Sequence, residues 1–256
     1  MKILITGGAG YIAKAISDAF VDYDVTVITR EDFDLTDKKS TDQWFEDKMF
    51  DAVIHTATVG GSRLKADTSE ELYQNLQIFY NLFDNKKSFN KFIQFGSGAE
   101  YTASSSPYGL SKRVINDISK QYANFYNLRI FGVFNSNELE TRFIKNNIIN
   151  YINYNPIEIY KDKFMDFIYM DDLVTIVKMC IDGDMEGGEY DCVYSNKYKL
   201  SDIATLINSL DDHSVDINIH DNDLDTSYIS HSIDIRCKSL KGIEKGIQET
   251  YISLKS

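Results

Sequence analysis

The chain of 256 residues is 43% hydrophobic and has a formal net charge of −12, with 39 acidic and 27 basic side chains. This length and composition allow one sizeable core, or one large domain with a smaller lobe. Only 2 prolines, 14 glycines and no fixed-period repeat argue against a repeat array or a disordered chain. The acidic balance repels phosphates at long range, which excludes a nucleic-acid polymer as partner, although a small anion can still bind locally.

The sequence also predicts no membrane association, no disulfide bond and no metal site. The first apolar run breaks at Gly7, and no later stretch approaches the roughly 20 apolar residues of a membrane helix, so we expect no signal peptide and no membrane association. The cysteines are odd in number and widely spaced: Cys180, Cys192 and Cys237. This disfavours disulfide bonds and a zinc site, and it fits a reducing cytoplasm. No metal is predicted, because metal-ligand spacing is missing from His213, His220 and His231.

Strands and helices alternate along the first 131 residues. Short apolar or β-branched runs predict strands at 2–6, 25–29, 52–55, 92–95 and 128–131. Apolar residues at helical spacing predict helices between them, at about 12–20, around Trp44 and Phe45, at 72–83 and at 110–125. Repeated β-α units of this length require right-handed crossovers and a parallel sheet with helices on both faces. The sequence therefore predicts a doubly wound α/β fold of the Rossmann type.

Beyond about residue 134 the alternation loosens, which indicates a second, smaller lobe. An Asn-rich helix is expected at 140–153 and a short strand at 157–160. Asp171 and Asp172 are expected to cap a helix that returns to the main sheet. The Rossmann domain is thus predicted to comprise 1–133 and about 166–196. The smaller C-terminal α/β lobe, predicted to bind the substrate, comprises about 134–165 and 197–256.

Residues 6–13, TGGAGYIA, form the clearest ligand-binding motif. Gly7, Gly10 and Ala13 match the spacing G-x-x-G-x-x-G/A directly after a strand and before a patterned helix. Glycines let the backbone turn tightly and approach a pyrophosphate, to which the helix presents N–H groups and the positive end of its dipole. The motif predicts dinucleotide binding, with a purely structural turn as the alternative.

Arg30, at the end of the second predicted strand, bears on the choice of dinucleotide. A carboxylate at this point accepts hydrogen bonds from a free ribose 2′-OH, whereas an arginine neutralises a 2′-phosphate. NADP(H) is therefore favoured, with NAD(H) left open because Glu31 and Asp32 offer Arg30 a surface ion pair instead. Beneath the adenine we expect Asp34 and Leu35.

Tyr108 and Lys112 lie four residues apart on one predicted helix, and hence on one face. A phenol is a poor acid or base at neutral pH, and a nearby ammonium favours its phenolate. The spacing alone is weak evidence: among 17 tyrosines about one such pair is expected by chance, and Tyr251 with Lys255 is a second. Position favours the first pair, because Ser97 lies just past the fourth strand, at the edge where α/β sheets bind ligands. We expect Ser97, Tyr108 and Lys112 to be catalytic.

Seven segments together carry a family resemblance: TGGAGYIA, AVIHTAT at 52–58, YQNLQ with Asn75, FGSGAEY at 95–101, PYGLSK at 107–112, LRIFGVF at 128–134 and DFIYMDDLV at 166–174. Over roughly its first 180 residues the chain resembles the extended short-chain dehydrogenase/reductase family, the NAD-dependent epimerases and dehydratases. Residues 29–37, TREDFDLTD, followed by DAVIHTATVGGSR, are most similar to GDP-fucose synthases and dTDP-4-keto-rhamnose reductases. Both of these are NADPH-dependent reductases.

The resemblance implies a nucleotide-sugar substrate, contacted by Ser97 and Tyr108, and a homodimer formed through the helices at about 70–85 and 108–125. It also implies that Tyr108 and Lys112 contact the cofactor. Further cofactor contacts are implied for Tyr11, Ile12, Ala57, Thr58, Phe95, Phe131 and Val133.

Departures from the family patterns narrow the implied reaction. The additional acid and base of GDP-fucose synthases are replaced here by Ala99 and Phe134, and the Asp-Glu pair of 4,6-dehydratases by Gly98 and Ala99. The arginine that usually precedes Asp-Phe, where it helps hold the substrate phosphate, is Met165. Other cations must then anchor the substrate, and the candidates are Arg142 and Lys145.

These observations favour NADPH-dependent reduction of a keto group, preferentially at C4, of a nucleotide-activated deoxy sugar. A second hypothesis is a nucleotide-sugar 4-epimerase with tightly held NAD, which needs the same three residues without net redox change. A third, from another class, is a catalytically idle NADP-binding sensor or scaffold. The intact serine, tyrosine and lysine set argues against the third.

Overall fold

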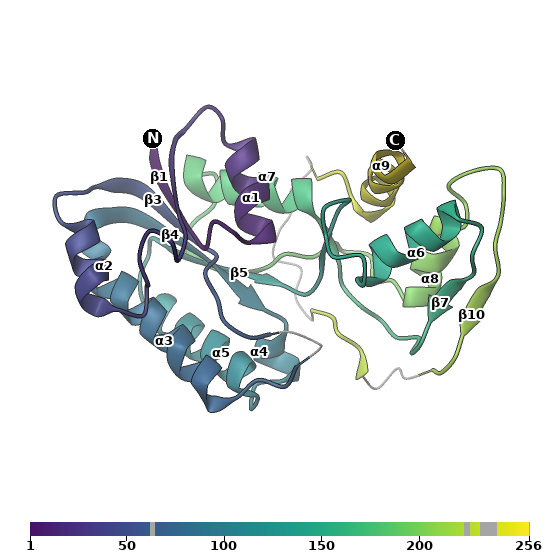
Figure 1. Ribbon diagram of the computed structural model, residues 1–256, viewed down its shortest axis with the longest axis horizontal. Helices are drawn as coiled ribbons and strands as arrows, with labels where there is room; N and C mark the ends of the chain where they lie inside the picture. Colours follow the sequence, from purple (N-terminus) through teal and green to yellow (C-terminus); the bar gives the residue numbers. More distant parts are fainter. Residues whose placement is uncertain (62–64, 223–225, 231–239, 256) are drawn as a thin grey trace. The chain divides into compact units, whose positions relative to one another are not determined.

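The computed structural model describes residues 1–61, 65–222, 226–230 and 240–255, which form two compact units (Figure 1). One unit comprises Met1–Arg129 with Ile176–Tyr190, and the other comprises Ile130–Thr175 with Asp191–Ser256. The sequence pattern predicts crossings between the two parts near 133, 166 and 196. Buried free thiols are found at Cys180 and Cys192. Two residues named above lie outside the described part of the chain, His231 and Cys237.

The first unit is built on a six-stranded sheet with the order β2-β1-β3-β4-β5-β9. Its strands are β1 (Lys2–Thr6), β2 (Asp24–Ile28), β3 (Phe50–His55), β4 (Phe89–Ser97), β5 (Phe125–Ile130) and β9 (Gly188–Asp191). β1 pairs in parallel with β2 on one side and with β3 on the other, and β3 pairs in parallel with β4. The strand order therefore reverses between β1 and β3, and open α/β sheets bind ligands at such a switch point.

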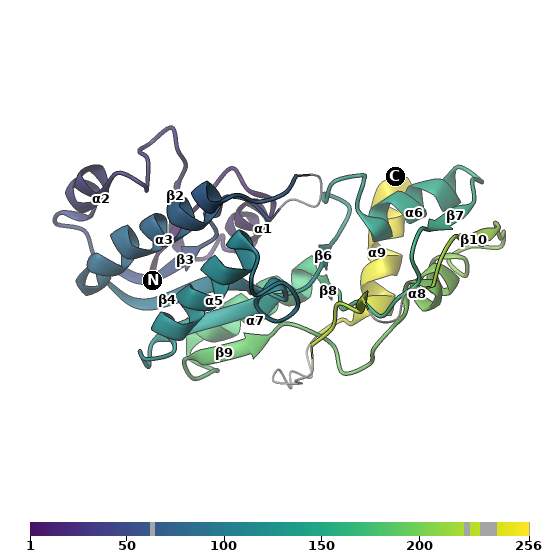
Figure 2. The ribbon, with the colours of Figure 1, turned by 90° about the horizontal axis from the view of Figure 1, so that it is seen from below.

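Helices cover both faces of this sheet, as the α/β prediction requires (Figure 1). One face carries α2 (Lys38–Phe45), α3 (Ser69–Asp84) and α5 (Pro107–Ser119), with the 3-10 turn Lys86–Ser88 before β4 and the short α4 (Ala99–Thr102) before α5. The other face carries α1 (Tyr11–Ala19) and the second half of α7 (Met170–Asp182). α3 and α5 run side by side (Figure 2). The predicted doubly wound Rossmann-type fold is confirmed.

The fifth strand begins earlier than the sequence pattern indicates. A helix was expected over 110–125, but α5 ends at Ser119 and Phe125 is the first residue of β5. The ring of Phe125 stacks on that of Phe92 at 5.0 Å between ring centroids, within an aromatic core beneath the sheet. Phe92 N–H also donates to Asn124 O, at 3.0 Å. Tertiary packing therefore overrides a helical spacing that continues by chance.

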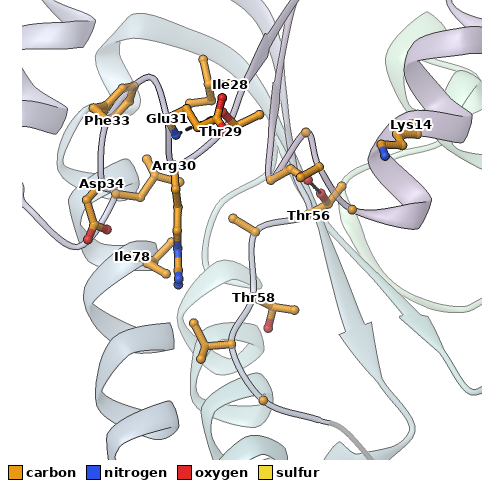
Figure 3. A pocket seen from close by; sticks show the side chains of 18 residues that line it. Lys14, Ile28, Thr29, Arg30, Glu31, Phe33, Asp34, Thr56, Thr58 and Ile78 are labelled. Carbon is orange, nitrogen blue, oxygen red and sulfur yellow. Dashed lines mark hydrogen bonds between the residues drawn. The ribbon is translucent and has the colours of Figure 1, made fainter.

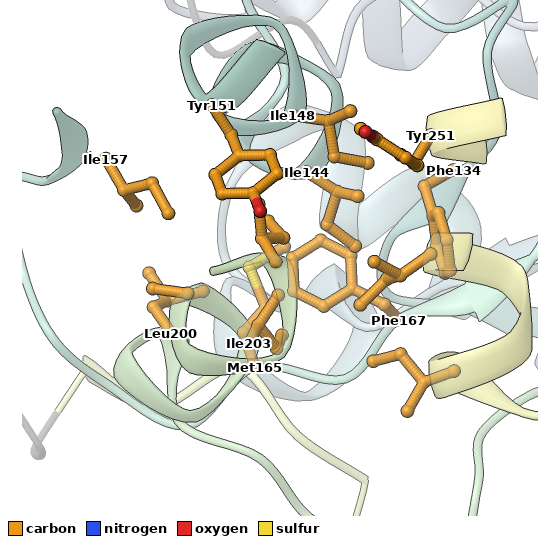
Figure 4. Packing of buried hydrophobic residues seen from close by; sticks show 14 of the residues in the cluster. Phe134, Ile144, Ile148, Tyr151, Ile157, Met165, Phe167, Leu200, Ile203 and Tyr251 are labelled. Atoms are coloured by element: carbon orange, nitrogen blue, oxygen red, sulfur yellow. The ribbon is translucent and has the colours of Figure 1, made fainter. Parts of the chain in front are cut away.

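The second unit is a small α/β lobe. Two parallel two-stranded sheets pair β6 (Val133–Phe134) with β8 (Ile168–Tyr169), and β7 (Ile157–Ile159) with β10 (Ile217–Ile219). Its helices are α6 (Phe143–Ile152), α8 (Leu200–Ile207) and α9 (Ile243–Lys255). Their apolar faces meet around Tyr151, Ile148 and Ile203, all fully buried (Figure 4). This lobe therefore has a hydrophobic core of its own.

The segment DFIYMDDLV departs from the sequence-based expectation in two ways. Its first half belongs to the second unit, because β8 pairs with β6 and Phe167 packs in the second core. The expectation that Asp171 and Asp172 cap a helix is wrong, since α7 begins at Met170 and both lie in its first turn. Asp172 instead accepts hydrogen bonds from the N–H groups of Lys241 at 2.7 Å and Gly242 at 3.0 Å, directly before α9.

Candidate active site

A pocket of about 870 Å³ opens at the carboxyl ends of β1, β2 and β3, at the switch point of the sheet (Figure 3). All of its lining residues belong to the first unit. Seven of the predicted cofactor residues line it: Gly7, Gly10, Arg30, Asp34, Leu35, Ala57 and Thr58. Residues from three separate βα connections therefore meet here.

The glycine turn after β1 can expose its backbone to the pocket because side chains would not fit. Gly7 has φ +72°, and a Cβ on it would lie 2.7 Å from Ala57 N. A Cβ on Gly8 would lie 2.2 Å from Val27 Cγ1. Gly10 is the N-cap of α1 and supplies no side-chain acceptor to the first turn of the helix. The turn is therefore a cradle of backbone at a helix N-terminus, which suits a pyrophosphate.

Arg30 reaches into this pocket from the end of β2. Its side chain extends between Ile78 of α3 and the segment that carries Thr58 (Figure 3). Asp32 is engaged elsewhere, because it accepts hydrogen bonds from Thr29 N at 2.8 Å and from Thr29 Oγ1 at 3.1 Å. Within the described part of the chain, Arg30 forms no ion pair with Glu31 or Asp32. The surface ion pair considered as an alternative for this arginine is thus not formed.

Several pocket residues were not predicted from the sequence. Lys14 lies on α1 four residues after Gly10, so helical spacing from the glycine motif could have placed it at the pocket. Ile78 comes from the middle of α3, and no sequence signal connects it with β2. The other unpredicted lining residues are Gly8, Ala9, Ile28, Thr29, Glu31, Phe33, Thr56, Val59 and Gly60.

Tyr108 and Lys112 lie in the first two turns of α5, whose start is fixed by local sequence. Ser106 is the N-cap, and its Oγ accepts a hydrogen bond from Gly109 N at 3.1 Å. Gly109 is needed for packing, because a Cβ there would lie 2.1 Å from Ala103 O. Lys112 Nζ donates to Phe95 O of β4 at 2.9 Å and lies 5.6 Å from the ring centroid of Tyr108. The structure therefore brings Phe95, Tyr108 and Lys112 together.

The charge of Lys112 is strongly influenced by its surroundings. Burial of the ammonium group lowers the pKa of Lys112 to about 8, and the carboxylate of Glu100 acts in the opposite direction. Burial, and secondarily the charge of Lys112, lower the pKa of His55 to about 3. His55 is therefore neutral at physiological pH, and its Nδ1 lies 2.8 Å from Thr6 Oγ1. A lysine that titrates near neutrality is well suited to tune a phenol.

Ser97 is the last residue of β4, two positions after Phe95. Its N–H donates to Glu100 Oε1 at 2.9 Å, and its Oγ accepts from Ala99 N at 3.2 Å. The side chain is buried. Ser97 therefore lies at the same strand end as the carbonyl that holds Lys112.

The loop after β3 connects the pocket with Tyr108. Gly60 lines the pocket, and Gly61, with φ +72°, lies so close to Tyr108 that a Cβ there would be 2.8 Å from the ring. Asn75 of α3 holds this loop through two hydrogen bonds of 2.8 Å, accepting from Val59 N and donating to Val59 O. The pocket and Tyr108 therefore share one loop.

The remaining predicted residues lie outside the pocket lining. Tyr11 and Ile12 are the first two residues of α1. Phe131 and Val133 belong to the second unit, as do Arg142 and Lys145, the candidate cations for the substrate phosphate. Arg142 is exposed at the N-cap of α6. Lys145 is engaged with the preceding loop, because its Nζ donates to Glu138 O at 2.8 Å.

The NAD dependent epimerase/dehydratase family matches residues 3–193, about three quarters of the chain. The chain belongs to this family. The curated CDP-abequose synthase of Yersinia pseudotuberculosis is 23% identical over 251 residues, covering 85% of this chain and 87% of that protein. The resemblance to the extended short-chain dehydrogenases is thereby confirmed, and the chain is an enzyme of that NAD(P)-dependent type.

Solved structures of similar fold include both reductases and epimerases. A GDP-mannoheptose C4 reductase from Campylobacter jejuni with NADP bound is 17% identical, with a TM-score of 0.75 over 100% of this chain and 98% of that one. A UDP-N-acetylglucosamine 4-epimerase from Bacillus cereus is 16% identical, with a TM-score of 0.82 over the whole of both chains. At such identities the likeness establishes the fold. In the described residues no helix has the length and apolar character required to cross a membrane.

Proposed function

We propose that this family member is an NADPH-dependent reductase that acts on a keto group, preferentially at C4, of a nucleotide-activated deoxy sugar. The observation that carries the proposal is the position of Lys112, which is hydrogen-bonded to Phe95 O and adjacent to the Tyr108 ring. The relatives named above, a CDP-abequose synthase and a GDP-mannoheptose C4 reductase, support a nucleotide sugar as the substrate class.

The side chains of this site divide the chemistry between them. When bound, NADPH supplies the hydride that reduces the carbonyl carbon. Tyr108 donates its phenolic proton to the substrate oxygen, and the ammonium of Lys112 stabilises the phenolate that remains. The Ser97 hydroxyl donates a hydrogen bond to the same oxygen and polarises the carbonyl. Ala99 and Phe134, at positions where GDP-fucose synthases carry an additional acid and base, leave a plain reduction as the simplest reaction.

Arg30 favours NADP(H) over NAD(H) as the cofactor. Its guanidinium lies in the pocket without an ion pair to Glu31 or Asp32, in the part of the chain that the structure describes. A 2′-phosphate provides the bidentate acceptor that an arginine prefers. The glycine turn accommodates the pyrophosphate, because no side chain occupies its pocket face at Gly7 or Gly8.

Substrate anchoring and assembly are further parts of the proposal. Of the two candidate cations, Arg142 is exposed, whereas Lys145 holds the loop that precedes α6. We therefore assign the phosphate contact to Arg142 rather than Lys145. A homodimer through α3 and α5 is supported by the exposure of two aromatic side chains on α3, Tyr73 and Tyr80.

The proposal is tested by following oxidation of NADPH and NADH with a panel of 4-keto nucleotide sugars. We expect turnover with at least one of them and a preference for NADPH that Arg30→Gln abolishes, with Lys14→Gln as the control for loss of a cation elsewhere in the pocket. If none of the keto sugars supports oxidation of NADPH, the reductase proposal is contradicted. If denaturation of the purified protein releases bound NAD, the 4-epimerase hypothesis replaces the reductase proposal.

A further inference from the structure

Glu100 and Arg129 form a buried ion pair beside Ser97. Arg129 Nε lies 2.9 Å from Glu100 Oε2, and both side chains are only 2% exposed. Asn127 Nδ2 also approaches the carboxylate, at 3.4 and 3.5 Å. An ion pair taken out of water is costly to maintain, and replacing it by apolar groups is often neutral or stabilising. A gain in folding stability therefore does not explain why the ion pair lies beside Ser97.

The carboxylate of Glu100 is directed at the backbone that ends β4. Glu100 Oε1 accepts the hydrogen bond from Ser97 N at 2.9 Å. Gly96 makes this approach possible, because a Cβ there would lie 2.4 Å from Glu100 Oε1. Both carboxylate oxygens are thus used, one for Arg129 and one for Ser97. The N–H of the last residue of β4 thereby donates to a charged acceptor.

Arg129 has a second carboxylate partner, Glu189, which is more exposed than Glu100. Arg129 Nη2 lies 2.9 Å from Glu189 Oε2, but the Glu189 side chain is 48% exposed. Glu189 also accepts a hydrogen bond from Asn116 Nδ2, at 2.6 Å, on the rear part of α5. The two carboxylates therefore neutralise the same guanidinium, while Glu100 is the one hydrogen-bonded to Ser97.

We propose that Glu100 is a positioning residue for the proposed reduction: it fixes Ser97 at the end of β4, the strand whose Phe95 carbonyl holds Lys112, and its carboxylate adds a negative charge to the surroundings of that lysine. The proposal rests on the function assigned to Ser97, Tyr108 and Lys112 above. Glu100 acts through Ser97 and Lys112, and contact with the substrate is not part of its role.

The groups that face Lys112 explain why a carboxylate is needed. Lys112 Nζ has the carbonyl of Phe95 and the ring of Tyr108 as neighbours, and His55 of β3 is neutral. Burial disfavours the ammonium, whereas the Glu100 carboxylate favours it. Burial also raises the pKa of Glu100, and Arg129 counteracts this by favouring the ionised form. Arg129 therefore opposes the effect of burial on the Glu100 carboxylate, which in turn favours the ammonium form of Lys112.

Glu100→Gln and Glu100→Asp separate the charge from the position. Glu100→Gln retains an acceptor for Ser97 N–H but removes the charge, so we expect the titration midpoint of Lys112 to fall by about one pH unit. Glu100→Asp retains the charge but shortens the side chain, so the midpoint should stay near the wild-type value. Both variants should lower kcat by about ten- to hundredfold with little change in the KM for NADPH. Glu189→Gln, the matched control on the same arginine, should leave both quantities near wild type.

The midpoint of Lys112 is read by NMR of the lysine side chain, which needs no substrate. If Glu100→Gln titrates Lys112 as the wild type does, the charge role is overturned, and an unchanged kcat in Glu100→Asp overturns the positioning role. Should Glu100→Gln fail to fold by circular dichroism, Glu100→Asp decides the proposal through its kcat and its unshifted midpoint. If the wild type reduces no keto sugar, the proposed function is contradicted, but the role of Glu100 is still tested by the titration of Lys112.

Discussion

The chain contains two Tyr-x-x-x-Lys pairs on helices, and their surroundings give them opposite properties. Lys112 of the first pair is part-buried, donates to Phe95 O, and has its pKa lowered to about 8 by burial. Lys255 of the second pair is exposed and donates to Asp211 Oδ2 at 2.6 Å and to the Tyr251 hydroxyl at 2.8 Å. These hydrogen bonds raise the pKa of Lys255 above its ordinary value.

The difference shows that spacing alone does not make a catalytic pair. Tyr251 donates its hydroxyl proton to Asp211 Oδ2 at 2.7 Å, so its polar end is tied to a carboxylate. Tyr108 instead lies against Gly61, in the loop that also lines the pocket at the carboxyl ends of β1, β2 and β3. A phenol next to a lysine of lowered pKa can exchange a proton near neutral pH, whereas one hydrogen-bonded to a carboxylate and a charged lysine has its hydroxyl engaged in structural hydrogen bonds.

The largest effect is expected when the two tyrosines are compared. Tyr108→Phe removes the proton donor and should lower kcat by about 10²- to 10⁴-fold, as loss of a general acid does. Tyr251→Phe removes the hydroxyl of the other Tyr-x-x-x-Lys pair and should leave kcat unchanged. Steady-state NADPH oxidation with the best keto sugar provides the measurement, with thermal unfolding to show that both variants fold. Near-normal turnover by Tyr108→Phe would contradict the mechanism.

The two lysines should differ in the same direction, though less strongly. Lys112→Met removes the charge that stabilises the phenolate and the hydrogen bond to Phe95 O, so we expect kcat to fall by about a hundredfold. Lys255→Met breaks an exposed ion pair, and such pairs contribute little to stability. Its kcat should match the wild type, with a small decrease in Tm at most. Equal loss of activity in both variants would mean that the distinction between the pairs is wrong.

The pH dependence of kcat should follow the first pair. Lys112 loses its charge as the pH rises through about 8, and the phenolate of Tyr108 then loses its stabilising cation. We therefore expect kcat to decline above about pH 8, with an apparent pKa that belongs to the coupled pair. A pH profile measured at saturating substrate checks this, and Lys255→Met should show the same profile. A kcat that stays constant to pH 10 would refute the assignment.

The smallest effect concerns the pH dependence of stability, where the two lysines have opposite signs. The folded-state pKa of Lys112, about 8, lies below the ordinary 10.5, so between these values the unfolded chain binds more protons and stability rises with pH. The folded-state pKa of Lys255 is raised, so its contribution is complete below 10.5 and is lost above it. Thermal unfolding from pH 7 to 11 tests this. Lys112→Met should remove the rise between pH 8 and 10.5, and Lys255→Met should retain it.

Local motifs identified much of the candidate site. The glycines of TGGAGYIA and Arg30 line one pocket, although they lie on two different βα connections. This was predictable because parallel strands bring their carboxyl ends to one edge. Phe33 and Ile78 also line that pocket, but apolar residues on a loop and a helix carry no signal of their own. Likewise, nothing in the spacing of Glu100 and Arg129 indicates that they form a buried pair.

The errors arose where distant contacts decide the outcome. Phe125 continues an apolar helical spacing, but stacking on Phe92 makes it the first residue of a strand. Asp172 precedes a helical pattern like an N-cap, yet its carboxylate accepts hydrogen bonds from the backbone before α9. In both cases a partner far away in the chain outweighs the local preference.

The sequence by itself determined the order of strands and helices, the glycine turn that Gly7 forms, and the one-face arrangement of Tyr108 and Lys112, because helix and strand periodicities and turn chemistry act over a few residues. The tertiary structure alone decided which of the two Tyr-x-x-x-Lys pairs has a lysine of lowered pKa. That property depends on burial against Phe95 and on the nearby charge of Glu100. Burial and electrostatics sum over neighbours in space, and those neighbours exist only once the sheet has formed.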